Sequence, residues 1–246
     1  TGVIAAGNIV GGIIGRASSV TNCYNTGNIT GSMTGGILGR GTVINCYNTG
    51  NVLNTTLGAS NITGGIVGDG STTNCFNKGK VVGASLPTGG IIGSGVAINC
   101  YNIGDVTGKG LTGGITGHDS ATNCYNAGTV TKDSGSDSNP VGGISIGNKT
   151  STNCHNTGDI KMNTPNPNIM YEIGGADNTC TYLLKSTNAK PENAVGKNEE
   201  EMKQIMDMNN FVKLMNTKVE ENNSDSNNTK LKKWELKDQM PVFSNN

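Results

Sequence analysis

The chain has 246 residues, of which 33% are hydrophobic and 4% aromatic, and this is too little apolar material for a thick globular core. Its 18 basic residues balance its 18 acidic residues, so no overall positive charge attracts nucleic acid or an anionic membrane surface. The 38 glycines are too many for a helical bundle, and they lack the every-third-residue period of collagen.

No part of the sequence has the run of roughly 18 apolar residues that a membrane-spanning helix needs, so we expect no membrane insertion. The N-terminus lacks the basic and then apolar layout of a signal peptide. Because the sequence opens inside a repeat, at Gly7-Asn8-Ile9, we expect it to be a fragment of a longer protein.

A repeated pattern with one cysteine per unit organises the chain from its start to Cys180. Each of the first six cysteines lies in the frame Asn-Cys-(Tyr, Phe or His)-Asn-x-Gly, a Gly-Gly-Ile precedes it by ten or eleven residues, and an isoleucine or valine follows it by six. The cysteine spacings of 23, 29, 25, 24, 30 and 26 residues vary between this valine position and the next Gly-Gly. Insertions on one side of a repeat are typical of a stacked solenoid.

The apolar stretches of each repeat are short, rich in Ile, Val, Thr and Tyr, and bounded by Gly and Asn, which indicates strands. One repeat buries a few apolar side chains at roughly 1.5 to 3 kcal/mol each, whereas ordering each residue costs about 1 to 2 kcal/mol, so a single turn is unstable alone. We therefore predict an all-β protein. It is a parallel β-helix with three short strands per turn and six to seven turns over residues 1–180, followed by a small α+β cap over residues 181–246.

The repeat predicts ladders of identical side chains along the solenoid. Because side chains alternate along a strand, the cysteine and the asparagine two residues later point one way and the aromatic residue between them points the other way. We place the cysteines inward as small apolar fillers, and the asparagines inward at a corner where stacked amides satisfy one another and the turn backbone. The opposite parity, with the aromatic residues inside, stays open at this stage. The predicted structural ladder comprises Cys23, Cys46, Cys75, Cys100, Cys124 and Cys154 with Asn25, Asn48, Asn77, Asn102, Asn126 and Asn156, and the predicted contact face comprises Tyr24, Tyr47, Phe76, Tyr101 and Tyr125.

The cysteine column also admits sharper interpretations. A disulfide between adjacent turns would leave the Cβ atoms about 4.8 Å apart, beyond the usual ~3.5 to 4.5 Å. A zinc site needs ligands that converge on tetrahedral corners, but no two cysteines form a C-x-x-C pair. A nucleophilic thiol needs a histidine neighbour, yet His118 and His155 occupy different columns. We therefore predict that all seven cysteines are reduced structural thiols, with no metal, no cofactor and no catalytic residue.

At Gly-Ile-x-Gly, for example Gly12-Ile13-Ile14-Gly15 and Gly36-Ile37-Leu38-Gly39, the sequence resembles the GLUG motif, with Ile where the name of the motif has Leu. The following Asn-Cys-Tyr-Asn-x-Gly-x-Val is similar to what accompanies that motif in bacterial proteins. The resemblance covers roughly residues 1 to 180 and departs at residues 143–147, which contain one extra residue. It implies a secreted or wall-anchored bacterial surface protein, a group that includes adhesin-like proteins and large IgA-specific metallopeptidases that carry the repeats outside the catalytic domain. It implies no catalytic residue.

Beyond Cys180 the glycine content falls and a helix is predicted. Asn198 and Glu201 have the spacing of a capping box, and apolar residues then recur at intervals of three and four to residue 216. We expect this helix to cover the open end of the solenoid, and a partner-binding groove made by its methionines is the alternative. Residues 220–229 read as a loop, and residues 233–236 with 240–243 as a short strand pair. The apolar stripe comprises Met202, Ile205, Met208, Val212 and Met215.

Three classes of function compete. The first is a noncatalytic repeat module of a bacterial cell-surface or secreted protein, which acts as a stalk or adhesin-like scaffold for a host or neighbouring-cell surface protein or glycan. The second is an accessory, substrate-binding or host-binding region of a large secreted peptidase. The third is a polysaccharide-active β-helix enzyme, but Asp69, Asp105, Asp119 and Asp159 lie in different columns and form no carboxylate pair. We predict the first class, as an extracellular monomer that binds no nucleic acid.

Overall fold

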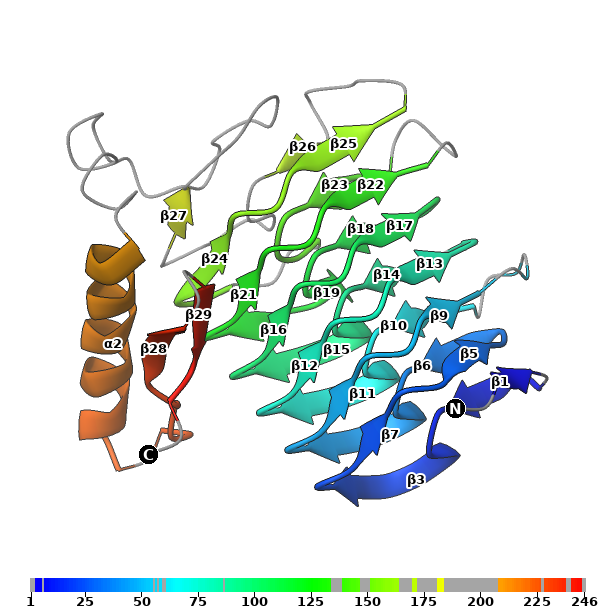
Figure 1. The fold of residues 1–246 in the computed structure, drawn as a ribbon, viewed down its shortest axis with the longest axis horizontal. Coiled ribbons are helices and arrows are strands. Elements are labelled where there is room, and N and C mark those ends of the chain that lie inside the picture. Colours follow the sequence, from blue (N-terminus) through cyan, green and yellow to red (C-terminus); the bar gives the residue numbers. More distant parts are fainter. Residues whose placement is uncertain are drawn as a thin grey trace.

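The repeats stack into a parallel β-solenoid, and a helix and a hairpin lie against its side (Figure 1). The computed structural model describes residues 3–5, 7–54, 56, 58, 61–85, 87–133, 139–146, 151–163, 170–171, 181–183, 208–226, 228–237 and 240–244. Within these residues, each full turn contributes one strand to each of four parallel sheets, here named A to D. The predicted parallel β-helix is confirmed, but the predicted three strands per turn are wrong.

The strands of each sheet occupy equivalent places in the repeat. Sheet A holds the valine position: β1 (Val3–Ala5), β5 (Asn28–Thr30), β9 (Val52–Leu53), β13 (Val81–Gly83), β17 (Val106–Gly108), β22 (Val130–Lys132) and β25 (Ile160–Met162). Sheet B ends at the first glycine of Gly-Gly in all strands but its last: β2 (Ile9–Gly11), β6 (Met33–Gly35), β10 (Thr63–Gly64), β14 (Thr88–Gly89), β18 (Thr112–Gly113), β23 (Val141–Gly142) and β26 (Met170–Tyr171). Sheet C lies between Gly-Gly-Ile and the cysteine: β3 (Ile14–Thr21), β7 (Leu38–Ile44), β11 (Val67–Thr73), β15 (Ile92–Ile98) and β19 (Thr116–His118), with β20 (Ala121–Thr122) also on β15. Sheet D holds the aromatic residue and the second asparagine: β4 (Tyr24–Asn25), β8 (Tyr47–Asn48), β12 (Phe76–Asn77), β16 (Tyr101–Asn102), β21 (Tyr125–Asn126), β24 (Cys154–Asn156) and β27 (Thr181–Leu183).

The single strand predicted around Gly-Gly-Ile is two strands, because a sheet B strand ends at the first glycine and a sheet C strand begins directly after the isoleucine, and the length of the sheet C strand was not predicted. The sheet C strand is the longest strand of the turn, yet in β11 only Val67 of its seven residues is an aliphatic side chain, and the others are Gly, Asp, Ser and Thr. Its pairing comes from backbone register: Asp69 lies opposite Arg40 on one side and Ser94 on the other. A ladder of backbone hydrogen bonds therefore holds a strand that has little apolar patterning.

The solenoid has five turns that carry all four strands, from β2–β5 to β18–β22. In the sixth turn, in which residues 147–150 lie outside the described part, two isolated bridges, Thr116 with Ser145 and Thr122 with Thr152, continue sheet C. β26 and β27 add a seventh strand to sheets B and D. The Gly-Gly expected for this last turn at residues 174–175, and Cys180, lie outside the described residues.

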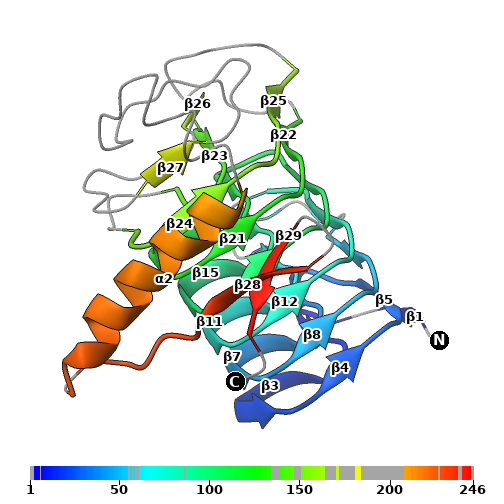
Figure 2. The same ribbon diagram turned by 60° about the vertical axis from the view of Figure 1, so that its left-hand side comes forward.

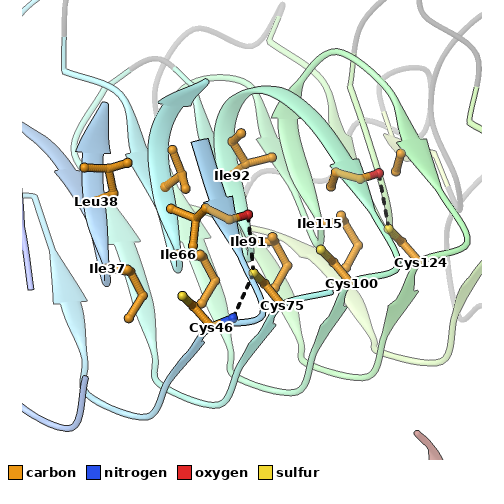
Figure 3. Close-up of a cluster of buried hydrophobic side chains, with 14 of the residues drawn as sticks. Ile37, Leu38, Cys46, Ile66, Cys75, Ile91, Ile92, Cys100, Ile115 and Cys124 are labelled. Atoms are coloured by element: carbon orange, nitrogen blue, oxygen red, sulfur yellow. Dashed lines mark hydrogen bonds between the residues drawn. The ribbon is translucent and has the colours of Figure 1, made fainter. Parts of the chain in front are cut away.

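Columns of small aliphatic side chains fill the interior. The isoleucine after Gly-Gly, the next aliphatic residue and the cysteine point into the solenoid in each central turn (Figure 3). In the second turn these are Ile37, Leu38 and Cys46, none more than 1% exposed. A second column, which contains Val81, Val106 and Val130, lines the inner side of sheet A.

The Gly-Gly column exists because neighbouring turns touch there. A Cβ atom placed on Gly36 would lie 2.1 Å from the carbonyl oxygen of Gly65 and 2.6 Å from the side chain of Asn48. The second glycine of the repeat therefore packs tightly against the next turn and against the inward side chain of the second asparagine, and the glycine position has no room for a side chain.

A helix and an antiparallel hairpin follow the solenoid, as predicted, with shifted helix bounds. The helix α2 (Met208–Ser224) continues past the predicted end at residue 216, and the hairpin pairs β28 (Trp234–Lys237) with β29 (Met240–Phe243). The helix continues because Val219 repeats the apolar stripe four residues after Met215, and both are buried. The predicted start at residue 198, Met202 and Ile205 lie outside the described residues. No helix in the described part of the chain has the length and apolar character needed to cross a membrane.

The expected position of this cap at the end of the solenoid is wrong. Helix α2 and the hairpin lie along the side, beside sheet D (Figure 2). Met215, Val219, Leu231 and Trp234 form one buried cluster with Tyr125. The outward aromatic side chain of sheet D provides the apolar surface that this segment covers.

Candidate functional site

The second asparagine of each repeat forms an inward ladder, as predicted. The Nδ2 group of Asn48 donates to the Oδ1 atom of Asn77 at 2.9 Å, and Asn77 donates in the same way to Asn102 at 2.9 Å. Each Nδ2 also donates to a backbone carbonyl two residues ahead, as Asn77 does to Gly79 at 2.7 Å. These buried amides connect successive turns and close the corner after sheet D.

The cysteine column also faces the interior. The described cysteines are free thiols, with Cys23 half-buried and Cys46, Cys75, Cys100, Cys124 and Cys154 buried. Each of these thiols donates to the carbonyl oxygen two residues before it, for example Cys100 to Ile98 at 3.2 Å. The open question of parity is settled for these turns: cysteines lie inside and aromatic side chains lie on the other side of sheet D.

Burial makes these thiols poor nucleophiles. Desolvation raises the pKa of Cys46 to about 11, and it also raises the pKa of Cys75, Cys100 and Cys124 well above the usual value for a thiol. The thiolate is the reactive form of cysteine, so these four cysteines are poor nucleophiles at neutral pH.

The four aspartates that the sequence placed in different columns each have a separate ion-pair or hydrogen-bond partner. Asp69 pairs with Arg40 at 3.0 Å, Asp119 with His118 at 3.3 Å and Asp159 with Lys161 at 3.7 Å. Asp105 accepts a hydrogen bond from the backbone N–H of Thr129. Among the described residues, no three side chains of His, Cys, Asp or Glu gather where they could hold a metal ion.

The first asparagine of the repeat forms a second ladder that sequence reasoning missed. These residues have φ angles of 51° to 56°, the left-handed region that asparagine tolerates better than other non-glycine residues. The Nδ2 group of Asn74 donates to Asn45 at 3.0 Å, that of Asn99 to Asn74 at 3.0 Å, and that of Asn123 to Asn99 at 2.8 Å. The asparagine before each of the first six cysteines was the available signal. The column, named here the outer asparagine ladder, comprises Asn22, Asn45, Asn74, Asn99, Asn123 and Asn153.

The aromatic residues of sheet D stack beside this ladder. Ring centroids are 5.2 Å apart from Tyr24 to Tyr47, 4.9 Å from Tyr47 to Phe76 and 4.9 Å from Phe76 to Tyr101, with nearly parallel planes. Exposure falls along the stack, from 59% at Tyr24 to 1% at Tyr125. The predicted contact face is therefore partly covered, and the inclusion of Tyr125 was wrong because Trp234 packs on its ring.

The C-terminal segment covers the ladder by pairing its backbone with the asparagine amides. The Nδ2 group of Asn99 donates to the Lys230 carbonyl at 3.4 Å, and the Lys232 N–H donates to the Oδ1 atom of Asn99 at 3.2 Å. One turn on, Asn123 donates to the Lys232 carbonyl at 2.9 Å and accepts from the indole N–H of Trp234 at 2.6 Å. Residues 230–234 thus lie along the outer asparagine ladder, and their backbone groups pair with its amides at intervals of two residues.

Comparisons with known proteins identify the motif and nothing more specific. The family model of the GLUG motif matches residues 6–30, which include strands β2 to β5 of the first turn. No curated protein and no solved structure matches the chain. The equivalent strands of the next turns pair with these strands in register. The first turn of this chain is a GLUG motif, and the turns stacked on it repeat its pattern.

Proposed function

We propose that the chain is a noncatalytic repeat module of a bacterial extracellular or cell-surface protein, where it serves as a stalk and adhesin-like binding scaffold. One observation carries this proposal. The residue types of the repeat that could do chemistry are engaged inside the solenoid: the buried thiols donate to backbone carbonyls of their own turn, and the inner asparagines of neighbouring turns bind one another. What repeats on the outside is a surface of amides and aromatic rings. Such a surface favours binding over turnover.

The shape supports the same function. A solenoid whose turns contact only their neighbours gives a long lateral surface, and the segments between sheets A and B vary in length without disturbing the register. The GLUG motif of the first turn supports an extracellular location, because that motif occurs in bacterial extracellular proteins. The partner is a protein or glycan on a host or neighbouring cell, and the module acts as a monomer.

Two measurements on the natural full-length protein test this function. Protease added to intact bacteria should remove the module, and a protein protected until the cells are lysed would exclude the proposed location. The purified chain should also give no turnover of plant or host polysaccharides. Hydrolase or lyase activity that survives repurification would overturn the noncatalytic assignment in favour of the enzyme class.

A further inference from the structure

We propose that the uncovered part of the outer ladder binds an extended polypeptide strand through the backbone of that strand. This part, named here the open ladder surface, comprises Asn22, Asn45 and Asn74 with Tyr24, Tyr47 and Phe76. The inference rests on the proposed scaffold function and specifies the class of ligand. The observation behind it is that the chain's own residues 230–234 already bind the adjacent turns of the outer asparagine ladder through their backbone.

The chain itself shows how the ladder recognises a strand. Asn99 donates to the carbonyl of Lys230 and accepts from the N–H of Lys232, two residues further on. Asn123 then donates to the Lys232 carbonyl, so each step of one turn corresponds to two residues of ligand. This is the pairing of β-strand addition, with side-chain amides in place of a strand edge. The asparagine amides bind the backbone groups of Lys230 and Lys232 and not their side chains.

The same recognition groups continue without a break onto the open ladder surface. Asn45, Asn74, Asn99 and Asn123 have φ angles of 55°, 56°, 51° and 53°, and their amides are joined in one chain of hydrogen bonds. That chain uses one N–H and one oxygen lone pair of each interior amide. At Asn99 and Asn123 the remaining groups bind the strand, and at exposed Asn45 and half-buried Asn74 the equivalent groups face solvent.

The aromatic stack favours a peptide over a glycan. Tyr47 and Phe76 each have a neighbouring ring on both sides at about 5 Å, so their faces are covered and their edges remain. A sugar ring would stack on an aromatic face. On the covered turns, Trp234 meets Tyr125 edge-on with a 78° angle between planes, and Phe243 lies tilted on Tyr101. An aromatic or aliphatic side chain of a bound strand can use the exposed ring edges in the same way.

The surface is hollow beside Lys230, where the cover that the C-terminal segment gives the outer asparagine ladder ends. A hollow of about 660 Å³ lies at this boundary and is lined by Asn74, Asn223, Lys230, Leu231, Lys232, Lys233 and Ser244. The three open rungs span about 10 Å at the spacing of parallel strands, which is room for four or five extended residues.

The test is a titration of the ¹⁵N-labelled full chain with a synthetic peptide of residues 228–237, followed by NMR. We expect the side-chain amide signals of Asn45 and Asn74 to shift at about 1 mM peptide. Asn45→Gly should weaken binding about five-fold, since one to two hydrogen bonds are lost, and glycine accepts the left-handed backbone at this position. N-methylation of the peptide at the residue equivalent to Lys232 should weaken binding similarly, because it removes a backbone donor.

Matched controls separate binding at the open ladder surface from binding elsewhere on the chain. Asn51→Ala removes an exposed amide that accepts one backbone hydrogen bond on another face, and it should leave binding unchanged. Shifts confined to Asn99 and Asn123 would mean that the peptide replaces the chain's own strand, and this would overturn the proposal. So would the absence of any shift, or binding of oligosaccharides but not of the peptide at Asn45. A negative titration leaves the proposed function standing, since cell-surface location and lack of turnover are measured independently.

Discussion

Single residues of the repeat have sharply different tasks. The second asparagine holds neighbouring turns together from inside, the cysteine fills the adjacent interior, and the first asparagine turns the chain between the strands of sheets C and D. Asn99 shows why that first position is asparagine: its backbone has a φ of 51° and its amide donates both to Asn74 of the preceding turn and to Lys230 of the C-terminal segment. Glycine would permit the turn but would supply no hydrogen bonds.

Burial of the thiols predicts a loss of stability at alkaline pH. Desolvation raises the pKa of Cys46 from 9.0 to about 11, so the folded chain keeps the proton where the unfolded chain is a thiolate. This contribution to stability is complete below pH 9.0 and is lost as the pH rises toward about 11. We expect the free energy of unfolding in urea to fall by about 1 kcal/mol or more between about pH 8.5 and about pH 10.5.

A matched pair of variants isolates the thiol contribution. Cys46→Ala should reduce the pH dependence by the contribution of one thiol, while Cys75, Cys100 and Cys124 still contribute, whereas Val43→Ala, which removes neighbouring core atoms without a titrating group, should keep the full dependence. Equal slopes in both variants and in the natural chain would assign the alkaline effect to other groups.

Strands that contain a regularly placed apolar residue could be predicted from the sequence, and strands without one could not. The strands of sheets A and D contain a valine or an aromatic residue at a fixed distance from cysteine, and the sequence located both. The division of the Gly-Gly-Ile stretch into strands of sheets B and C was missed because β11 reads Val-Gly-Asp-Gly-Ser-Thr-Thr, and only stacking in register makes this polar segment a strand. The cap was found but misplaced, since a sequence pattern shows that a helix has an apolar face and does not show which surface it meets. The outer ladder was missed because its backbone angle, and not its hydrophobicity, defines it.

The C-terminal segment should be held to the solenoid chiefly by Trp234, which is 2% exposed. Its indole binds Asn123, its ring packs on Tyr125 and Phe243, and its backbone N–H and carbonyl bind Asn216. Trp234→Ala should cost about 3 to 5 kcal/mol of docking energy, whereas Trp234→Phe keeps the ring packing and should cost about 1 to 2 kcal/mol. Hydrogen exchange should rise in residues 121–131 and 154–160.

The second turn, residues 33–53, serves as the internal reference for this experiment. Within the described part of the chain, no hydrogen bond or ring contact joins this turn to the hairpin, so its exchange should stay unchanged. A uniform rise along the whole solenoid would show that the segment stabilises all turns together and not the turns it touches.

The whole molecule behaves as a stack in which each turn contacts its neighbours, and its ends differ from its middle. In the described residues the first turn has the complete second turn on one side and only strand β1 on the other, and the exposure of Tyr24 and the half-buried Cys23 show that its corner is half-exposed. Loss of this turn leaves the remaining pairs intact, whereas a defect in the middle separates two short stacks. The same substitution should therefore lower the stability of the protein more in a middle turn than in the first turn.

Gly65→Ala and Gly12→Ala provide that identical change. An added Cβ would lie 2.1 Å from the Gly90 carbonyl oxygen at residue 65, and 2.2 Å from the Gly36 carbonyl oxygen at residue 12, with an asparagine side chain 2.7 Å away in both cases. In the third turn neither neighbour can withdraw, so we expect Gly65→Ala to lower the melting temperature by roughly 10 °C or to prevent folding. In the first turn strands β2 to β4 can detach, so Gly12→Ala should lower it by only about 2 to 4 °C while hydrogen exchange rises in residues 9–25. Thermal unfolding followed by circular dichroism, with exchange measured by mass spectrometry, gives both values. Equal shifts for the two variants would mean that the stack unfolds as one unit, because the energy of every turn would then depend on all the others.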